Sequence, residues 1–477
     1  MSFVFSRRRL ETLAPDEFRS ALVARVDAGG RLVAFFGLPS GDGSRLHAVV
    51  ADDARGSVQV SVAEVRGLFP SITPVCPQAQ LFERELHETG SINIAGHPWL
   101  KPVRRPLAYN DFFKVEGHEI HEVGVGPVHA GIIEPGHFRF QCHGEKVLHL
   151  EIALGYQHRG IEAMLCGASP ARAACIAELV AGDTSAAHTV AVCEALEALS
   201  GEAVKGDAAI CRAIALELER LANHTGDLGA LANDIGFLPV ASFCGRLRGD
   251  FLNMTALVCG NRFGRGWIVP GGTAFGIDAA LAEELRDRLQ KHARDVRGAA
   301  ELLFATPSVQ SRFEGIGKIT QEDCRALGAT GVAARATGIA RDARLDFPSP
   351  GYAGSGLRAS VSQYGDVHAR AVVRWREIQQ SFGFLERALG VLQPGGQDAD
   401  RMNLAPDSIA VSFVEGWRGP VCHVVLTDSK GRIEHCKIVD PSFYNWMALA
   451  IAMRGQQISD FPLCNKSFNL SYSGFDL

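Results

Sequence analysis

Six ionisable side chains gather in two neighbouring stretches, GPVHAGIIEPGHFRF and LEIALGYQHRGIEAML. Histidine changes charge near neutral pH, and a positioned carboxylate can exchange protons with a bound molecule. His158 and Glu162 are four residues apart, so on a helix they would face the same way. We therefore predict a site here, although Glu162 taken alone is better interpreted as a surface ion-pair residue. The members are His129, Glu134, His137, His158, Arg159 and Glu162.

A second polar group is Glu217, Arg220, His224 and Asp227, whose spacing places all four on one face of an apolar helix. We predict a hydrogen-bonded seam between packed helices, with proton relay as a minor alternative. A third group lies in Gly/Ala-rich chain, and structural ion pairing is its favoured interpretation. Its members are Arg312, Glu314, Arg335, Arg341, Asp342, Arg344 and Asp346.

The twelve cysteines are numerous, but no two of them have C-x-x-C spacing. That excludes zinc ribbons, thioredoxin-like motifs and the usual self-contained iron–sulfur ligand runs. We therefore expect no metal and no cofactor bound by this chain alone.

Length and charge limit the class of protein further. A chain of 477 residues exceeds what one hydrophobic core usually organises, so two domains are expected. The net charge of −5 argues against a nucleic-acid partner. No run of eighteen apolar residues occurs, so we expect a cytoplasmic chain whose membrane contact comes through partner subunits.

The residue patterns predict an α+β fold. Residues 1–110 mix strand-like runs such as RLVAFFGL with a helix starting at LFEREL, which indicates a small α/β domain. The body, residues 120–477, begins with a small sheet from about 124 to 152 and then becomes mostly helical. Strands return after about 408, and the tail from 440 is predicted to be irregular.

Several long motifs now resemble one superfamily, the large subunits shared by nickel–iron hydrogenases and respiratory complex I. They stand in the family's order and include GPVHAGIIEPGHFRF, LGYQHRGIE, ERLANHTGDLGAL, GNRFGRGWIVPGG, RFEGIGKI and GDVHARAVVR. The membrane-bound hydrogenase branch, with formate hydrogenlyase and hydrogenase-4-type large subunits, is the most similar. FEREL and GHPWLKP resemble the small complex I subunit that is fused to the large subunit in this branch.

The resemblance implies where nickel would bind in an active hydrogenase. That family uses four thiolates, two from C-x-x-C-x-x-x-H and two from D-P-C-x-x-C, because thiolate is a soft, anionic ligand that bridges metals. In ELVAGDTSAAH, His188 matches the histidine, so Ala181 and Thr184 stand at the first two cysteine positions. In DPSFYNW, Ser442 and Asn445 stand at the other two. We therefore expect no nickel–iron centre, as in a metal-free subgroup of these complexes.

The resemblance also implies a quinone site, because complex I uses the vacated region for a quinone headgroup. His137 lies close to the position of the quinone-contacting histidine, whereas Leu179 stands at the tyrosine position. Glu134 matches the glutamate of the hydrogenase E-G-H element, with Pro135 inserted, and that glutamate is linked to proton transfer. Under this resemblance Glu134, His137, His158, Arg159 and Glu162 would be catalytic, while His137 and His188 would contact a bound cofactor or acceptor.

Two functions remain open at this point. The chain is either a redox subunit, passing electrons from a partner iron–sulfur small subunit to a quinone-like acceptor, or a non-catalytic coupling subunit. The resemblance implies antiporter-like membrane partners and a peripheral place on the cytoplasmic side of the inner membrane. An active hydrogenase is the third and least favoured interpretation.

Overall fold

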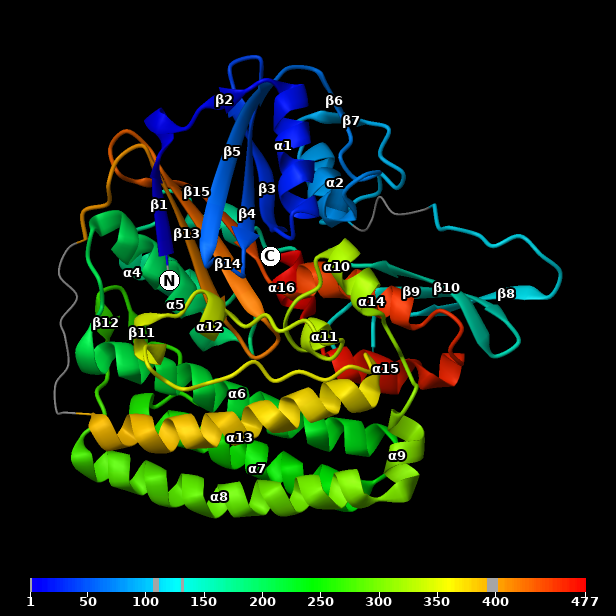
Figure 1. The fold of residues 1–477 in the computed structure, drawn as a ribbon, viewed down its shortest axis with the longest axis vertical. Coiled ribbons are helices and arrows are strands. Elements are labelled where there is room, and N and C mark those ends of the chain that lie inside the picture. Colours follow the sequence, from blue (N-terminus) through cyan, green and yellow to red (C-terminus); the bar gives the residue numbers. More distant parts are fainter. Residues whose placement is uncertain (1, 106–110, 130–132, 393–401) are drawn as a thin grey trace.

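The structure is a computed structural model that describes residues 2–105, 111–129, 133–392 and 402–477. The predicted α+β class is confirmed. Long helices form one layer, the C-terminal strands lie against it, and the N-terminal strands and helices lie beyond them (Figure 1). No helix in these ranges is long and apolar enough to cross a membrane.

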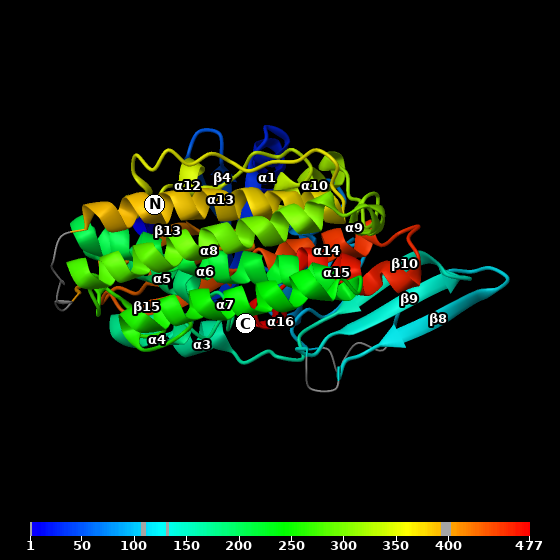
Figure 2. The ribbon, with the colours of Figure 1, turned by 90° about the horizontal axis from the view of Figure 1, so that it is seen from below.

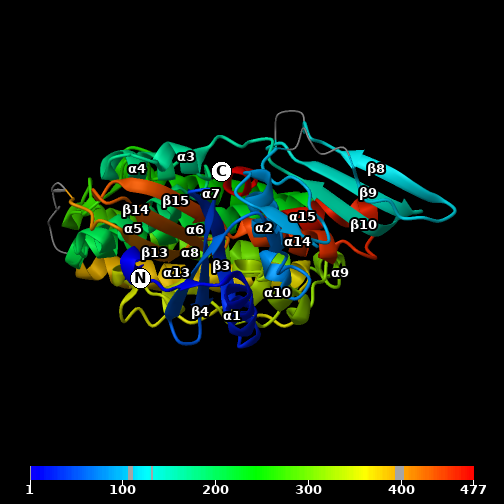
Figure 3. The ribbon, with the colours of Figure 1, turned by 90° about the horizontal axis from the view of Figure 1, so that it is seen from above.

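The N-terminal region is built around a four-stranded sheet in the order β2-β5-β4-β3. β3 is buried from Arg31 to Phe36, and it pairs with β4 in antiparallel register. Two helices contact β3 (Figure 3). The elements are β2 (Thr12–Leu13), α1 (Pro15–Asp27), β3 (Arg31–Ser40), β4 (Gly43–Asp52), β5 (Ser57–Val65), β6 (Leu68–Pro70), α2 (Gln80–Glu88) and β7 (Asn93–Ala95).

A three-stranded antiparallel sheet follows and projects away from the helices (Figure 2). Its strands are β8 (Ile120–Val125), β9 (His137–His143) and β10 (Lys146–Ala153). This sheet was predicted from the alternation of apolar residues and is confirmed. Its central strand, β9, begins at His137, so the fold places one predicted site residue at a strand terminus.

Long helices pack side by side in the body, with α6 against both α7 and α13. Asp278 and Asp366 cap α8 and α13 by accepting backbone N–H bonds, which fixes where these helices begin. The helices of this region are α3 (Ile161–Leu165), α4 (Pro170–Ala177), α5 (Ser185–Ser200), α6 (Gly206–Asp234), α7 (Leu238–Cys259), α8 (Ala279–Ala305), α9 (Pro307–Phe313), α10 (Gln321–Leu327), α11 (Gly331–Arg335), α12 (Ala343–Asp346) and α13 (Val367–Val391), and the short strands are β11 (Ile268–Val269) and β12 (Gly272–Thr273).

The C-terminal strands form a second four-stranded sheet, in the order β1-β13-β14-β15. Every residue of β13 is buried, because α5 packs against the sheet. The first strand of the chain, β1, pairs with β13, so the two ends of the chain share one sheet. The predicted domain boundary near residue 110 stays a prediction. The strands are β1 (Ser2–Ser6), β13 (Ser408–Glu415), β14 (Pro420–Thr427) and β15 (Ile433–Val439).

The tail from residue 440 is helical, which corrects the prediction of an irregular tail. It contains α14 (Ser442–Ala452), α15 (Phe461–Phe468) and α16 (Tyr472–Asp476). α14 is buried around almost its whole circumference and therefore lacks the apolar stripe that reveals a surface helix. α16 is a single turn, too short to give a periodic pattern, and the Ser471 hydroxyl caps it by accepting from Gly474.

Candidate functional site

The last helix, α16, joins segments that are hundreds of residues apart in the sequence. The backbone N–H of Ser471 donates to the Ser442 hydroxyl over 2.9 Å. Gly474 packs so closely on Asp440 that an added Cβ would lie 2.8 Å from its carboxyl carbon. The DPSFYNW turn and the C-terminus are therefore one packed unit.

Three of the predicted site residues meet at α16. The Arg159 guanidinium donates to the carbonyl of Ser473 (3.0 Å), and the N–H of Ser473 donates to Glu134 (3.4 Å). His158 Nδ1 lies 2.8 Å from the backbone carbonyl oxygen of Asp476. Because His158 and Arg159 are exposed and Glu134 is half-buried, this outer group lies at the protein surface.

Asp476 belongs to the same group, although nothing in the sequence singled it out. Its carboxylate accepts backbone N–H bonds from Gly155 (2.7 Å) and Gln157 (2.8 Å). Burial, with a further contribution from Glu134, raises the pKa of Asp476 to about 6. A carboxyl group with that pKa can release and recover a proton near neutral pH.

Two predicted residues lie elsewhere. Glu162 accepts from the Ile438 N–H (2.8 Å) and lies 3.2 Å from the Lys437 ammonium group. His137 contacts the Gly126 carbonyl (3.2 Å) and stands beside the ring of Phe112.

The predicted helical pairing of His158 with Glu162 is wrong. Helix α3 begins only at Ile161, and Gly160 before it has a positive φ of 70°, which a side-chain-bearing residue rarely adopts. The chain therefore turns between the two residues, and the two side chains have different partners.

A buried chain of hydrogen bonds lies on the inner side of α16. His188 is placed between Asp440, at 3.1 Å, and His423, at 3.0 Å, and all three are fully buried. Burial opposes ionisation of Asp440, yet the hydrogen bond from His188 holds the pKa of Asp440 below its usual value. Burial and the neighbouring His188 hold the pKa of His423 well below its usual value, so His423 is neutral.

Arg418 joins the turn between β13 and β14 to the segment that carries Thr184, one of the positions matched to the first cysteine pair. The Arg418 guanidinium donates two hydrogen bonds to the Asp183 carboxylate, of 2.6 and 2.8 Å, and a third to the Thr184 hydroxyl, of 3.0 Å. A bidentate pair of this kind fixes both geometry and charge. The turn that carries Arg418 is pressed against α11, since a Cβ on Gly331 would lie 1.8 Å from the Arg418 carbonyl oxygen.

The positions that match the second cysteine pair are also engaged. Asn445 accepts from the Thr330 N–H and donates to the Thr330 carbonyl, each over 3.1 Å. Ser442 accepts from Ser471, as described above. Ala181, which stands at a position of the first pair, is fully buried and has no side-chain atom that could bind a metal. The polar atoms here therefore bind backbone groups of neighbouring segments.

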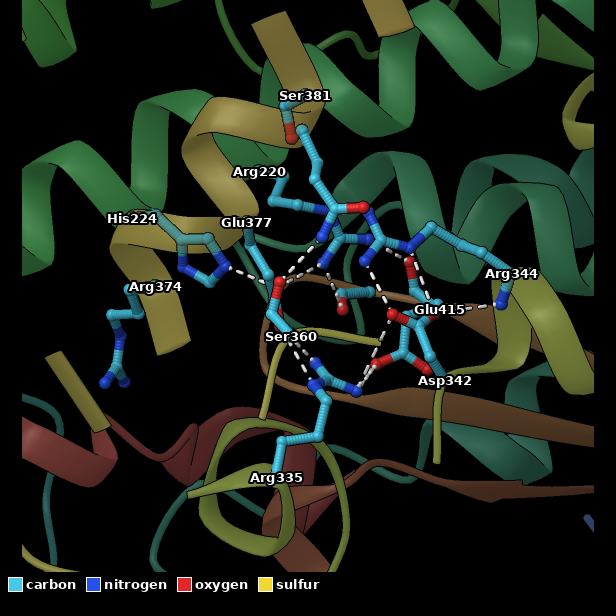
Figure 4. A network of polar contacts seen from close by, with 12 residues as sticks. Arg220, His224, Arg335, Asp342, Arg344, Ser360, Arg374, Glu377, Ser381 and Glu415 are labelled. Atoms are coloured by element: carbon cyan, nitrogen blue, oxygen red, sulfur yellow. Dashed lines mark hydrogen bonds and ion pairs between the residues drawn. The ribbon is translucent and has the colours of Figure 1, made fainter. Parts of the chain in front are cut away.

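Most of the second polar group and part of the third form one buried cluster (Figure 4). Arg312 pairs instead with Asp460, and Arg341 pairs with Asp53. Arg335 lies 2.8 Å from Glu377 and 2.7 Å from Glu415, and His224 lies 2.9 Å from the same Glu377. Further ion pairs extend the cluster to Arg344 with Asp342 and Glu217, and to Arg220 with Glu217 and Glu377. A separate buried pair joins Arg374 to Asp227. The prediction of structural pairing is confirmed for these residues.

Comparison with known proteins identifies the family. Residues 234–408 and 399–477, just over half of the chain, match the family described as respiratory-chain NADH dehydrogenase, 49 Kd subunit. Residues 36–118 match the 30 Kd subunit family of the same dehydrogenase. The chain belongs to the 49 Kd subunit family and carries a 30 Kd-like segment before it, which confirms the predicted resemblance.

Curated relatives share most of the length. A carbon monoxide-induced hydrogenase from Rhodospirillum rubrum is 31% identical, over 73% of this chain and 96% of that protein. Formate hydrogenlyase subunit 5 from Escherichia coli is 29% identical over 88% of this chain and 79% of its own length. Subunit 4 of a Thermus thermophilus NADH-quinone oxidoreductase is 27% identical over 72% and 90%.

A solved structure has the same fold. A chain of the archaeal membrane-bound sulfane sulfur reductase, a respiratory membrane complex, aligns with a TM-score of 0.70. The alignment covers 75% of this chain and 99% of that chain at 22% identity, so it establishes the architecture alone.

Proposed function

We propose that this chain is the large subunit of a membrane-associated oxidoreductase complex that passes electrons from a partner iron–sulfur subunit to a quinone-like acceptor. Membership of the 49 Kd family and similarity to an NADH-quinone oxidoreductase subunit support this class. The observation that carries the proposal is the outer group at α16, where Asp476, with a pKa near 6, lies beside Glu134, His158 and Arg159.

The chemistry of the acceptor explains why such a group is needed. Reduction of a quinone to a quinol takes two electrons and two protons. The electrons would come from the partner subunit's cluster, and the protons would pass through Asp476 and Glu134. Arg159, which is held by the carbonyls of Leu179 (2.5 Å), Val180 (2.9 Å) and Ser473 (3.0 Å), would keep a positive charge near the reduced, anionic ring.

The residues at the family's nickel positions do not fit that metal. Thr184, Ser442 and Asn445 offer neutral oxygen or amide groups instead of thiolates, and Ala181 offers no ligand. Their polar atoms already bind Arg418, Ser471 and Thr330. We infer that the four nickel ligands have been lost and that no step of the reaction passes through nickel.

Partners and location follow from the same proposal. An iron–sulfur small subunit would supply the electrons, and antiporter-like membrane subunits would anchor the complex. The chain itself would stay peripheral, on the cytoplasmic side of the inner membrane. Any ion translocation coupled to the electron transfer would take place in those other subunits.

A second function is favoured by one specific observation. At the vacated metal positions, hydrogen bonds between segments replace the ligands, with Asn445 tying α14 to Thr330 and Arg418 tying its turn to Asp183. Such bonds would stabilise a purely structural subunit that couples the small subunit to the membrane subunits.

Substitutions in the assembled complex separate the two functions. Under the redox proposal, in which the family resemblance places His137 against the quinone, Glu134→Gln and His137→Ala abolish electron transfer to a quinone such as decylubiquinone while the complex still assembles. His143→Ala, an exposed histidine at the other end of β9, is the matched control. Full turnover in both test variants would eliminate the redox proposal, and loss of activity only together with loss of assembly would favour the structural one.

A further inference from the structure

A cavity lies where α2, β10 and α14 meet, and Phe475 of α16, next to Asp476 of the outer group, also lines it. Its cavity volume is about 70 Å³, and it opens to solvent at its mouth. α2 belongs to the 30 Kd-like segment and α14 to the part that matches the 49 Kd family, and β10 lies between the two matched regions. The cavity is thus assembled from both parts of the chain.

Aromatic rings form a large part of the cavity wall. The rings of Trp99 and His149 are stacked, with centroids 5.7 Å apart and planes inclined by 26°. Trp446 and Phe475 line the cavity as well, together with aliphatic side chains from α2 and β10. Flat rings gain most from such walls, because offset stacking adds to the burial of apolar surface.

The charge on the lining is positive. Glu151 is already held by the Lys101 ammonium group (2.8 Å) and by the Phe113 N–H (2.7 Å). Arg454 lines the cavity and is exposed, and its guanidinium group has no ion pair or hydrogen bond within the described part of the chain. Burial and the charge of Arg454 lower the pKa of His149, so the stacked imidazole is neutral and leaves the positive charge at the mouth.

We propose that this cavity binds a small planar aromatic carboxylate, with its ring against Trp99 and His149 and its carboxylate paired with Arg454. Guanidinium is the side-chain group best matched to a carboxylate, since it can donate two parallel hydrogen bonds. The proposal rests on the cavity alone and does not depend on electron transfer to a quinone.

A ligand in this cavity would contact helix α14, which also bonds to the C-terminal segment. Trp446, Met447 and Ala450 line it from α14, and α14 begins at Ser442, which is bonded to the C-terminal segment. A bound ring would therefore contact the same helix that carries Ser442 and Asn445. Occupancy is expected to raise the melting temperature, because a ligand that binds only the folded state stabilises it.

Isothermal titration calorimetry with 2-naphthoate tests the proposal on the full chain with any subunits that purify with it. We expect saturable binding that weakens by about 10-fold in Arg454→Gln, equivalent to the loss of one charged contact. Ala450→Phe, which fills the cavity from α14, is expected to abolish binding. Arg297→Gln removes another exposed arginine, on α8, and is the matched control, expected to bind as the unsubstituted chain does.

The possible outcomes divide cleanly. Absence of binding by the unsubstituted chain up to about 1 mM, a weak affinity of about −4 kcal/mol, would overturn the proposal. Equal binding of naphthalene-2-carboxamide would overturn the assignment of an anionic ligand, as would undiminished binding by Arg454→Gln. Since Arg454 is exposed, its variant is expected to fold even if Ala450→Phe does not.

Discussion

The buried cluster around Glu377 and the outer group around Asp476 contain similar side chains, but their carboxylates have different partners. In the cluster each carboxylate faces arginines, and Arg335, Arg220 and His224 hold the pKa of Glu377 well below its usual value despite burial. Asp476 meets backbone N–H groups instead, and burial raises its pKa to about 6. Opposite-charge pairing keeps Glu377 ionised, whereas its absence leaves Asp476 able to titrate.

The secondary-structure elements that carry the cluster are long or fully buried, whereas those that carry the outer group are loops and one short helix. The cluster joins the long helices α6 and α13 to the buried strand β13, all of which have many packing contacts. The outer group is carried by the loop before α3, the loop that contains Glu134, and the single-turn helix α16. We infer that the cluster supports the fold and that the outer group carries the chemistry.

The largest effect is expected from Glu377→Gln. Loss of this carboxylate leaves Arg335 and Arg220 without a shared buried partner, which should lower the free energy of unfolding by about 3–5 kcal/mol. Urea denaturation followed by circular dichroism measures the change. Glu386→Gln, at an exposed position of the same helix, is the control, and equal effects of the two substitutions would remove the distinction between cluster and surface.

A pH dependence distinguishes Asp476 from the paired carboxylates. The folded chain holds the Asp476 proton more tightly than the unfolded chain, whose pKa is near 3.8. Stability should therefore fall as pH rises from about 4 to about 6, by up to about 3 kcal/mol, and then stay constant with respect to this group. Comparison of the unfolding free energy of the unsubstituted chain with Asp476→Asn across this range isolates the contribution. A constant difference between the two would show that Asp476 does not titrate there.

Much of the fold was predictable from the sequence, because alternation and helical spacing mark elements with one apolar face. The strands β8–β10 and β13–β15 lie close to their predicted places, and the stretch predicted to be mostly helical contains α6, α8 and α13. The tail was missed because α14 is buried on almost all sides and α16 is one turn long.

The site was harder to predict than the fold. Spacing on a presumed helix suggested a pair of His158 with Glu162, but the backbone turns at Gly160. Asp476, His423 and Arg418 gave no local signal, since their roles come from partners that are hundreds of residues away in the sequence. The glycines on either side of Trp417 and Arg418 were the one available hint of a tight turn.

Introducing a thiol at Asn445 should have an intermediate effect. Asn445→Cys removes both hydrogen bonds to Thr330 and leaves the buried Thr330 N–H without its partner, at a cost of about 1–3 kcal/mol. Thermal denaturation of the purified chain measures this cost. No loss of stability would mean that these bonds do not hold the turn in place.

The smallest effect is expected at a surface ion pair. Arg288 and Glu284 lie one turn apart on α8, at 2.6 Å, with both side chains more than 40% exposed. Glu284→Gln should change the free energy of unfolding by less than about 0.5 kcal/mol, because solvent screens such pairs. A change as large as that of Glu377→Gln would contradict the view that burial sets the value of these pairs.

The most direct test of the account is metal analysis of the purified complex that contains this chain. Inductively coupled plasma mass spectrometry should find iron, from the partner's iron–sulfur cluster, and no stoichiometric nickel. That result would fit Thr184, Ser442 and Asn445 as hydrogen-bonding residues in place of ligands. Nickel close to one atom per chain would contradict the account and restore hydrogen chemistry as the leading function.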